Sequence, residues 1–228
     1  MAKSLTLVEQ HPAIWRGNQS HSVLAKRIPT RITNLDAALS GGFPEWGVVR
    51  IRARQGTGEL SFLRHLISQE AADKLITFIN PPGYILAPWL KNFGLDPAHC
   101  WLINTTDEFS KWSAEESIRS GACRCVFLWA NTLSPKQARR LQVATEQHHC
   151  QMILYEELSC PRQPLPVPLD LSVYATEEGL KIDIHKQQGG WAKEDIHFAF
   201  SYTPNNSEIR DIISRYQTSK TAVTTLRG

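Results

Sequence analysis

A short glycine-containing stretch carries the clearest chemical signal in the chain. Residues 48–61 read VVRIRARQGTGELS, which is the pattern of a strand, a turn and the start of a helix, as in an ATP-binding phosphate loop. In such a loop the last glycine is followed by a Lys that meets the β- and γ-phosphates, and then by a Ser or Thr that holds Mg²⁺. Here Gly58 is followed by Glu59 and Leu60. The turn therefore lacks the groups that do phosphate chemistry.

The side chain of Glu59 decides what such a turn can bind. It places a negative charge at the N-terminus of an expected helix, where backbone N–H groups would otherwise attract a phosphate. We expect the carboxylate to favour the helix dipole by itself and the loop to fold without a nucleotide. The residues of this degenerate loop are Ala53, Gly56, Gly58, Glu59 and Leu60. A simpler alternative, that residues 53–59 form only a tight strand-to-helix turn, leads to the same functional expectation.

Composition places the chain among single globular domains. Its 228 residues are 42% hydrophobic and 21% charged, which suits one domain with a sizeable core. A formal net charge of +3 is too small to argue for nucleic-acid binding by itself. Residues 1–10 hold no long apolar run, and no stretch approaches the roughly 20 apolar residues of a membrane span. We expect a cytoplasmic protein without a signal peptide or a membrane segment.

The cysteines do not form a recognisable metal-binding pattern. No two of the five have C-x-x-C spacing, and four lie in or beside apolar runs, so we expect buried, reduced thiols rather than a metal site. They are Cys100, Cys123, Cys125, Cys150 and Cys160. The run His148-His149-Cys150 is a poor ligand set, because adjacent histidines at a helix end point in different directions. We expect no metal and no cofactor.

Strands and helices alternate along residues 47–155. Apolar runs predict strands at 47–53, 75–79, 100–103, 125–129 and 152–155. Helices are expected between them, at about 59–73, 85–93, 106–120 and 134–148. Ser134-Pro135-Lys136-Gln137 is a capping box with Pro in the first turn, and Thr33 or Asn34 can cap a short helix before the first strand. The alternation predicts the α/β class, with a mostly parallel sheet covered on both faces.

The pattern changes after residue 157. Four prolines between 161 and 168 mark a stiff loop, and period-two alternation then predicts antiparallel strands at 169–174, 180–184 and 196–200. The polar tail that follows and the N-terminal residues lack this alternation of apolar and polar positions. We therefore divide the chain into an N-terminal arm at 1–29, a core domain at 30–202 and a C-terminal tail at 203–228 that is a candidate for partner binding.

The order of these parts resembles the core of RecA. Residues 34–47 are similar to the RecA segment that leads into its phosphate loop, and residues 114–126 to the helix and strand that deliver its Walker B Asp. Residues 186–200 resemble the late strands of RecA. The resemblance covers roughly residues 30–200 and implies a RecA-like core: a mostly parallel sheet flanked by helices, with antiparallel strands added at the C-terminal side.

Four short motifs narrow the resemblance. They are Trp15-Arg16-Gly17 in the arm, residues 56–60 in the loop, Asn80-Pro81-Pro82-Gly83 after the second strand, and residues 119–123. Their order and spacing resemble the ImuA family of translesion-synthesis accessory proteins, which is related to RecA and to the division inhibitor SulA. This resemblance implies a non-catalytic adaptor in an SOS-type DNA-damage response. The implied partners are an ImuB-like Y-family protein, an error-prone polymerase III alpha-type subunit and RecA.

The departures from RecA concern its catalytic groups. RecA-like ATPases place a catalytic Glu just past the strand that ends here near Asn80, and an Asp at the end of the next apolar strand. Pro82 and Trp129 stand at those places. With Glu59 in place of the Walker A Lys, we expect no catalytic residues, because phosphoryl transfer depends on positioning and charge stabilisation. The two RecA DNA-binding loops are also curtailed, after Trp129 and at residues 158–168, so we expect weak or indirect DNA binding.

Candidate partner-binding residues fall at both ends of the chain. Trp15 and Arg16 are interface-favoured residue types in the N-terminal arm. In the tail, an apolar stripe at helical spacing stands beside two arginines and suits a partner's groove. These tail residues are Ile209, Arg210, Ile212, Ile213, Arg215 and Tyr216. In both places the alternative, docking on the protein's own core, stays open.

Two other functional interpretations compete with the adaptor role. Lys136, Arg139 and Arg140 share one side of a predicted helix and could meet DNA phosphates, although a solvated face is the better expectation. As a whole, the chain could instead be a SulA-like inhibitor of cell division that binds FtsZ. The arm and the loop region at 11–60, which SulA-like proteins lack, favour the ImuA resemblance.

Overall fold

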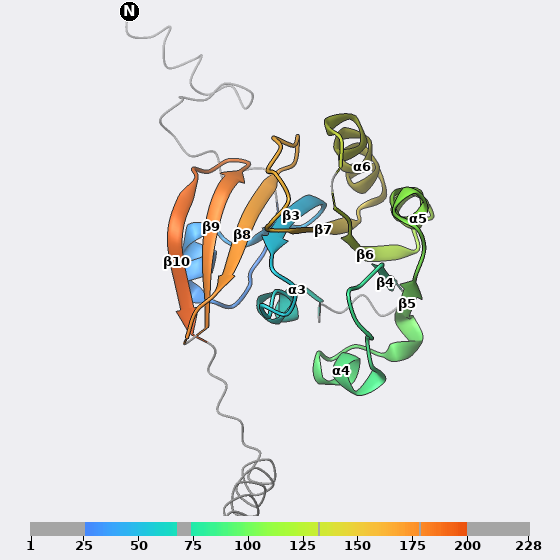
Figure 1. Ribbon diagram of the computed structural model, residues 1–228, viewed down its shortest axis with the longest axis horizontal. Coiled ribbons are helices and arrows are strands. Elements are labelled where there is room, and N and C mark those ends of the chain that lie inside the picture. Colours follow the sequence, from blue (N-terminus) through green and yellow to red (C-terminus); the bar gives the residue numbers. More distant parts are fainter. Residues whose placement is uncertain (1–25, 68–73, 132, 178, 200–228) are drawn as a thin grey trace, which may run out of the picture. The chain divides into compact units, whose positions relative to one another are not determined.

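The mixed sheet is the organising element of the protein. The computed structural model describes residues 26–67, 74–131, 133–177 and 179–199 (Figure 1). Eight strands lie in the order β10-β9-β8-β3-β7-β6-β4-β5. Their bounds are β3 Gly47–Ala53, β4 Leu75–Ile79, β5 Cys100–Ile103, β6 Cys123–Trp129, β7 Gln151–Glu157, β8 Leu169–Ala175, β9 Gly179–Gln187 and β10 Lys193–Ala199. The strand predictions are confirmed, with shifts of a few residues at some ends.

The pairing directions confirm the predicted fold class. Parallel pairs join β3 to β7 and β8, β6 to β7, and β4 to β5 and β6. The pairing of β8 with β9 is antiparallel, and β10 follows β9 in the sheet. The sheet is thus mostly parallel, with antiparallel pairing at its C-terminal side. The first strand of this sheet along the chain, β3, lies near its middle.

Helices cover both faces of the sheet (Figure 1). Their bounds are α2 Thr33–Ala38, α3 Arg64–Ile67, α4 Ala87–Asn92, α5 Asp107–Arg119 and α6 Pro135–His148, with 3₁₀ turns η1 Ser61–Leu63 and η2 Pro97–His99. One core lies between the sheet and α2, α3 and α4, and the other between the sheet and α5 and α6. Strand β3 serves both cores, because Val49 and Ile51 face the first and Val48 faces the second. Central strands buried on both faces are typical of parallel sheets.

Two predicted helix starts have different outcomes. The capping box at Ser134 is confirmed: its hydroxyl accepts from the Gln137 N–H at 3.3 Å, and the Gln137 side chain accepts from the Ser134 N–H at 2.9 Å. The caps predicted for α2 are wrong, because Ile32 is the residue before the helix and makes no side-chain cap. Asp36 instead accepts from the N–H groups of Thr30 and Arg31.

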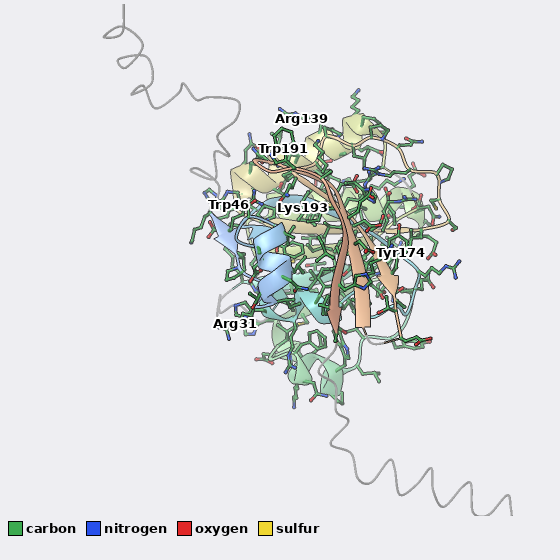
Figure 2. All side chains as sticks on the ribbon, turned by 90° about the vertical axis from the view of Figure 1, so that its left-hand side faces the viewer. Arg31, Trp46, Arg139, Tyr174, Trp191 and Lys193 are labelled. Carbon is green, nitrogen blue, oxygen red and sulfur yellow. The ribbon has the colours of Figure 1, made fainter. Side chains whose placement is uncertain are left out.

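A second, smaller sheet and the last strand enclose α2. Strands β1 Arg27–Ile28 and β2 Phe43–Pro44 pair in antiparallel fashion on either side of this helix in the sequence. From β10, the ammonium of Lys193 donates to the carbonyls of Ala37 and Ala38 at 3.3 and 3.0 Å (Figure 2). Within the ranges that the structure describes, no helix is long and apolar enough to cross a membrane.

Candidate functional site

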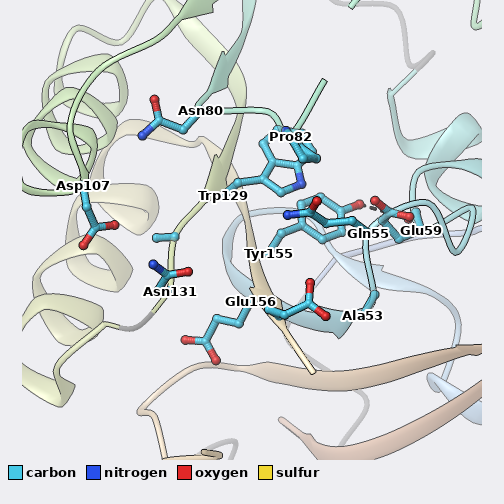
Figure 3. Close-up of a pocket in the computed structure, with 12 residues that line it drawn as sticks. Ala53, Gln55, Glu59, Asn80, Pro82, Asp107, Trp129, Asn131, Tyr155 and Glu156 are labelled. Atoms are coloured by element: carbon cyan, nitrogen blue, oxygen red, sulfur yellow. Dashed lines mark hydrogen bonds between the residues drawn. The ribbon is translucent and has the colours of Figure 1, made fainter. Parts of the chain in front are cut away.

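A pocket lies where the parallel strands β3, β4, β6 and β7 end. Ligands of open α/β sheets bind at the carboxyl ends of the strands, so this is the expected place for a site. The cavity measures about 250 Å³ (Figure 3). It is lined by Ala53, Gln55, Glu59, Asn80, Pro82, Asp107, Trp129, Ala130, Asn131, Tyr155, Glu156 and Glu157.

The structure brings together the positions that the sequence marked as altered. Glu59, Pro82 and Trp129 come from three separate segments and all line this one pocket, as does Ala53 at the end of β3. The other loop residues, Gly56, Gly58 and Leu60, belong to the same loop without lining the cavity. The predicted partner-binding residues Trp15, Arg16, Ile209, Arg210, Ile212, Ile213, Arg215 and Tyr216 lie outside the described residues.

The loop after β3 is closed by its own backbone. Gly56 and Gly58 adopt φ values of +79° and +89°, which other residues rarely adopt. The Thr57 N–H donates to the Arg54 carbonyl at 3.2 Å, and the Ser61 N–H to the Gly58 carbonyl at 2.8 Å. Phosphate sites of this kind need backbone N–H groups aimed at the ligand. Two of the loop's N–H groups are instead committed to internal turns.

The helix start differs from its prediction. A continuous helix from residue 59 is wrong, because η1 begins only at Ser61 and α3 follows it at Arg64. The first turn of η1 holds no acidic residue, so Glu59 does not stabilise a helix dipole there. The Glu59 side chain is therefore not committed to the start of the helix.

Glu59 is a buried acid that faces the pocket. The residue is 8% exposed, and its backbone carbonyl accepts a hydrogen bond from the Tyr155 hydroxyl at 3.0 Å (Figure 3). Burial raises the pKa of Tyr155 well above its usual value, and the nearby Glu59 charge adds to this, so the phenol stays a neutral donor. Among the described residues, no side chain forms a hydrogen bond or an ion pair with the Glu59 carboxylate.

Aromatic rings form one wall of the pocket. Trp129 on β6 and Tyr155 on β7 are register partners, and their rings stack with centroids 4.9 Å apart and planes 16° apart. Deeper in the same core, Phe127 stacks on Phe78 at 5.0 Å. The indole thus stands at the end of β6, where the resemblance places a metal-orienting Asp. It supplies a flat apolar surface in place of a charge.

The charges around the pocket are negative. Four acids line it, Glu59, Asp107, Glu156 and Glu157, and no Lys, Arg or His is among its lining residues. Asp107 pairs with Lys111 at 3.2 Å, and Glu156 pairs with Arg50 at 3.5 Å. Burial raises the pKa of Glu156, while the two arginines Arg50 and Arg52 oppose that shift.

Glu59 and Glu157 are left without an ion pair among the described residues. Like charges repel a triphosphate, and a closed loop offers it few N–H groups. The arrangement is suited to a cation and not to an anion.

Two buried arginines hold the proline-rich loop against the sheet. Arg50 donates to the Gln163 carbonyl at 2.7 Å, and Arg52 donates to the carbonyls of Leu158 at 3.2 Å and of Cys160. Residues 158–168 are the segment expected to correspond to a curtailed DNA-binding loop. Both guanidinium groups are buried and donate to carbonyls of the same protein, with only the Arg52 Nε left without a hydrogen bond among the described residues, so neither is available to phosphates from outside.

Sequence-based prediction missed several residues of the pocket. Gln55, Asp107, Asn131 and Tyr155 were not singled out, although each follows or ends a predicted strand or begins a predicted helix. The rule that parallel strands gather ligands at their carboxyl ends would have found most of them. The arginines Arg50 and Arg52 also carried a signal, as two charges at alternate positions of an otherwise apolar strand.

One of the basic residues of α6 is bound by the protein itself. Arg140 donates to both carboxylate oxygens of Glu115 on α5, at 2.8 and 2.6 Å.

All five cysteines are free thiols, and burial raises the pKa of Cys125 to about 12. In the described part of the chain, no three His, Cys, Asp or Glu residues are grouped closely enough to hold a metal ion.

An edge of the sheet carries exposed apolar side chains. Strand β5 ends the sheet order, and α5 follows it in the chain. Trp101 and Leu102 on β5 are 57% and 46% exposed, and Phe109 and Trp112 on α5 are 57% and 61% exposed. We call these four residues the edge aromatics and leucine. Trp101 and Leu102 are successive strand residues and therefore face opposite sides of the sheet at this edge. Large exposed apolar groups are typical of interaction surfaces.

The fold and the pocket define an α/β protein with a mostly parallel sheet and an acidic, aromatic-walled site at the strand ends. No family model matches this chain, and no curated protein matches it. Among solved structures, the chain is similar to SulA from Pseudomonas aeruginosa, with 21% sequence identity and a TM-score of 0.42. That match covers 48% of this chain and 97% of the SulA chain. The resemblance to the ImuA family therefore rests on the sequence motifs alone.

Proposed function

We propose that this protein is a non-catalytic adaptor of the DNA-damage response, which supports error-prone translesion synthesis through protein–protein contacts. The observation that carries the proposal is the composition of the pocket at the ends of β3, β4, β6 and β7. It is lined by four acids and by no Lys, Arg or His, where an ATPase of this layout would hold MgATP. A protein of this kind acts through what it binds and not through turnover.

One exposed surface supports contacts with other proteins. The edge aromatics and leucine present four large apolar side chains on β5 and α5 to solvent. Trp and aromatic residues are enriched among the side chains that dominate interface energetics. By resemblance to the ImuA family, the partners are an ImuB-like Y-family protein, an error-prone polymerase III alpha-type subunit and RecA.

Direct DNA binding is a minor part of this proposal. Arg50 and Arg52, on the central strand, are 1% and 6% exposed and are occupied by internal acceptors. Arg140 is paired with Glu115. Since phosphate contacts by free Lys and Arg supply most non-specific affinity, we expect weak binding that disappears as salt is raised.

Co-purification tests the adaptor role. The full chain should co-purify with the ImuB-like protein or with RecA at micromolar concentration, and it should show no ATPase activity above a buffer control. Binding to neither protein would overturn the proposal, as would saturable MgATP binding with hydrolysis that loop substitutions abolish. Overproduction in undamaged cells gives a further readout, because filamentous cells would indicate the SulA-like division inhibitor instead.

A further inference from the structure

We propose that the acidic pocket binds an organic cation, namely the guanidinium or ammonium end of an Arg or Lys side chain presented by a partner protein. Three observations carry this inference: a buried acid whose carboxylate has no partner among the described residues, the fixed position of that acid, and the aromatic and amide side chains that line the same cavity. The proposal rests on the proposed function only in taking a protein as the source of the cation.

The first observation is the state of Glu59. The residue is more than nine-tenths buried, lines the cavity, and has no ion-pair or hydrogen-bond partner for its carboxylate within the described ranges. The Glu59 oxygens are not among the fully buried side-chain atoms without a partner, so the carboxylate meets the cavity, where an entering cation would pair with it. Glu157, at the end of β7, adds to the same pocket a second acid that has no ion pair in the part of the chain that the structure describes.

The second observation is that the acid is held in place. The Tyr155 hydroxyl binds the Glu59 carbonyl at 3.0 Å, and the turn that follows is closed by the Ser61 N–H on the Gly58 carbonyl at 2.8 Å. Tyr155 itself is fixed by stacking on Trp129 at 4.9 Å. A site that is already ordered loses less entropy when its ligand arrives.

The third observation is the chemistry of the walls. A guanidinium is flat, weakly hydrated and able to stack on aromatic rings, and it offers five N–H donors. The pocket provides the Trp129 indole as a surface and the side-chain oxygens of Gln55 and Asn131 as acceptors beside the carboxylates. This combination matches an organic cation and leaves a triphosphate without any cationic partner.

A metal ion fits the pocket less well than an organic cation. No three of its acids are placed closely enough to act as ligands in the part of the chain that the structure describes. Hard divalent cations need several oxygen ligands at short range. A cavity of about 250 Å³ is also below the usual size of a site for a complete small molecule or nucleotide, whereas one side-chain end can enter it.

A titration with model compounds tests the pocket directly. The full chain is titrated with N-acetyl-arginine amide, and the NMR signal of the Trp129 indole N–H is followed, with its assignment taken from Trp129→Phe. We expect a saturable shift with a Kd near about 1 mM, which corresponds to a binding free energy of about 4 kcal/mol. N-acetyl-citrulline amide, which replaces the guanidinium by a neutral urea, should give no saturable shift. Equal responses to the two compounds would overturn the proposal.

Matched variants connect the binding to Glu59. Glu59→Gln should weaken arginine-amide binding at least about tenfold, as expected for the loss of a desolvated charge pair. Glu194→Gln removes an exposed acid from β10 and should change nothing. Unchanged binding in Glu59→Gln would refute the assignment.

A second pair of variants decides the matter if Glu59→Gln does not fold. Asn131→Lys places an ammonium at the pocket from the chain itself and should block the arginine compound. Gln188→Lys adds the same charge at an exposed position outside the pocket and should not. Full binding by Asn131→Lys would contradict the proposal.

The source of the cation is decided by two further measurements. Spermidine represents a free amine, and the ImuB-like protein represents a partner side chain. Weaker co-purification of Glu59→Gln than of Glu194→Gln would support a protein source, whereas spermidine binding with equal co-purification would overturn that source. If neither variant nor the unaltered chain co-purifies, the adaptor role fails, while the arginine-amide titration still decides the pocket.

Discussion

Arg50 and Asp170 form a bidentate ion pair across β3 and β8, with Nε–Oδ1 at 3.0 Å and Nη2–Oδ2 at 2.5 Å. The two residues are 1% and 2% exposed. Arg162 approaches the same carboxylate at 2.9 Å, and Arg50 also faces Glu156 at 3.5 Å. Each charge is tolerated in the protein interior because the other is present.

Breaking this pair from one side should be more harmful than removing both partners. Arg50→Met alone leaves Asp170 short of a partner and should lower the free energy of unfolding by about 3–5 kcal/mol. The double variant Arg50→Met/Asp170→Leu should lose less than the sum of the two single changes, by about 0.5–3 kcal/mol. Urea unfolding of the four proteins measures this coupling. Strict additivity would mean that the pair does not interact in solution.

The pair should also make stability depend on pH in acid. Burial alone would raise the pKa of Asp170, but hydrogen bonds from Arg50 and Arg162 outweigh it and hold the pKa below its usual value. Its stabilising contribution is therefore present above the unfolded pKa of about 3.9 and is lost as the pH falls toward the folded pKa. The raised pKa of Glu156 works in the opposite direction, since the folded state takes up that proton first.

Asp170→Asn isolates the first effect. The free energy of unfolding of the unaltered protein should fall more steeply between pH 5 and pH 3 than that of the variant, measured by urea unfolding at each pH. Glu194→Gln, at an exposed residue on β10, serves as a control for the loss of a carboxylate. Parallel curves for the unaltered protein and Asp170→Asn would rule out this source of acid sensitivity.

The uncompensated charge of Glu59 should reduce stability. Glu59→Gln keeps the size of the side chain and removes a largely buried charge that has no partner among the described residues, so the free energy of unfolding should rise by about 0.5–1 kcal/mol. Glu194→Gln, on the surface, should stay within about 0.5 kcal/mol of the unaltered protein. A loss of more than about 1 kcal/mol in Glu59→Gln would indicate a stabilising role for this acid within the folded chain.

The Tyr155 hydroxyl should hold the loop that carries Glu59. Tyr155→Phe removes its hydrogen bond to the Glu59 carbonyl and should cost about 1 kcal/mol. Amide hydrogen exchange should become faster at Thr57 and Ser61, while the amides of β6 stay protected. Tyr84→Phe is the matched control, because Tyr84 is 95% exposed. Unchanged exchange in the loop would show that the turns alone fix it.

The edge aromatics and leucine should matter for partners and not for folding. Phe109→Ser/Trp112→Ser removes two exposed rings from α5, so the free energy of unfolding should change by no more than about 0.5 kcal/mol per site. Affinity for the proposed ImuB-like partner should fall at least about tenfold in pull-down or calorimetry. Trp191→Ser changes another exposed indole, two residues before β10 (Figure 2), and should have no effect. Equal loss in the two variants would argue against a specific surface.

Local sequence patterns predicted the elements of the sheet closely. The strands at 47–53, 75–79 and 100–103 have the predicted bounds, because short apolar runs between polar turns suit buried strands. The helix at Ser134 was predicted by its capping box, which depends only on side chains three residues apart. Such features are set by neighbours in the sequence and can therefore be recognised there.

The site was predictable only in part, because its properties depend on distant segments. The altered positions Glu59, Pro82 and Trp129 could be named from the resemblance, but their common cavity arises from the sheet order. The delayed start of the helix after Glu59 could not be foreseen, since local propensity does not specify the hydroxyl that Tyr155 brings from β7. Arg50 finds its partner 120 residues away, which no local pattern can specify.

The place of β3 has a consequence for synthesis of the protein on the ribosome. This strand leaves the exit tunnel long before β7 and β8, which later lie on either side of it. During that interval Val48, Val49 and Ile51 form an unpaired apolar segment of the kind that aggregates. The guanidinium groups of Arg50 and Arg52 interrupt it, and charges at such positions act as gatekeepers against self-association. The same two arginines thus keep the nascent strand soluble and, once residue 170 has been made, become its internal anchors.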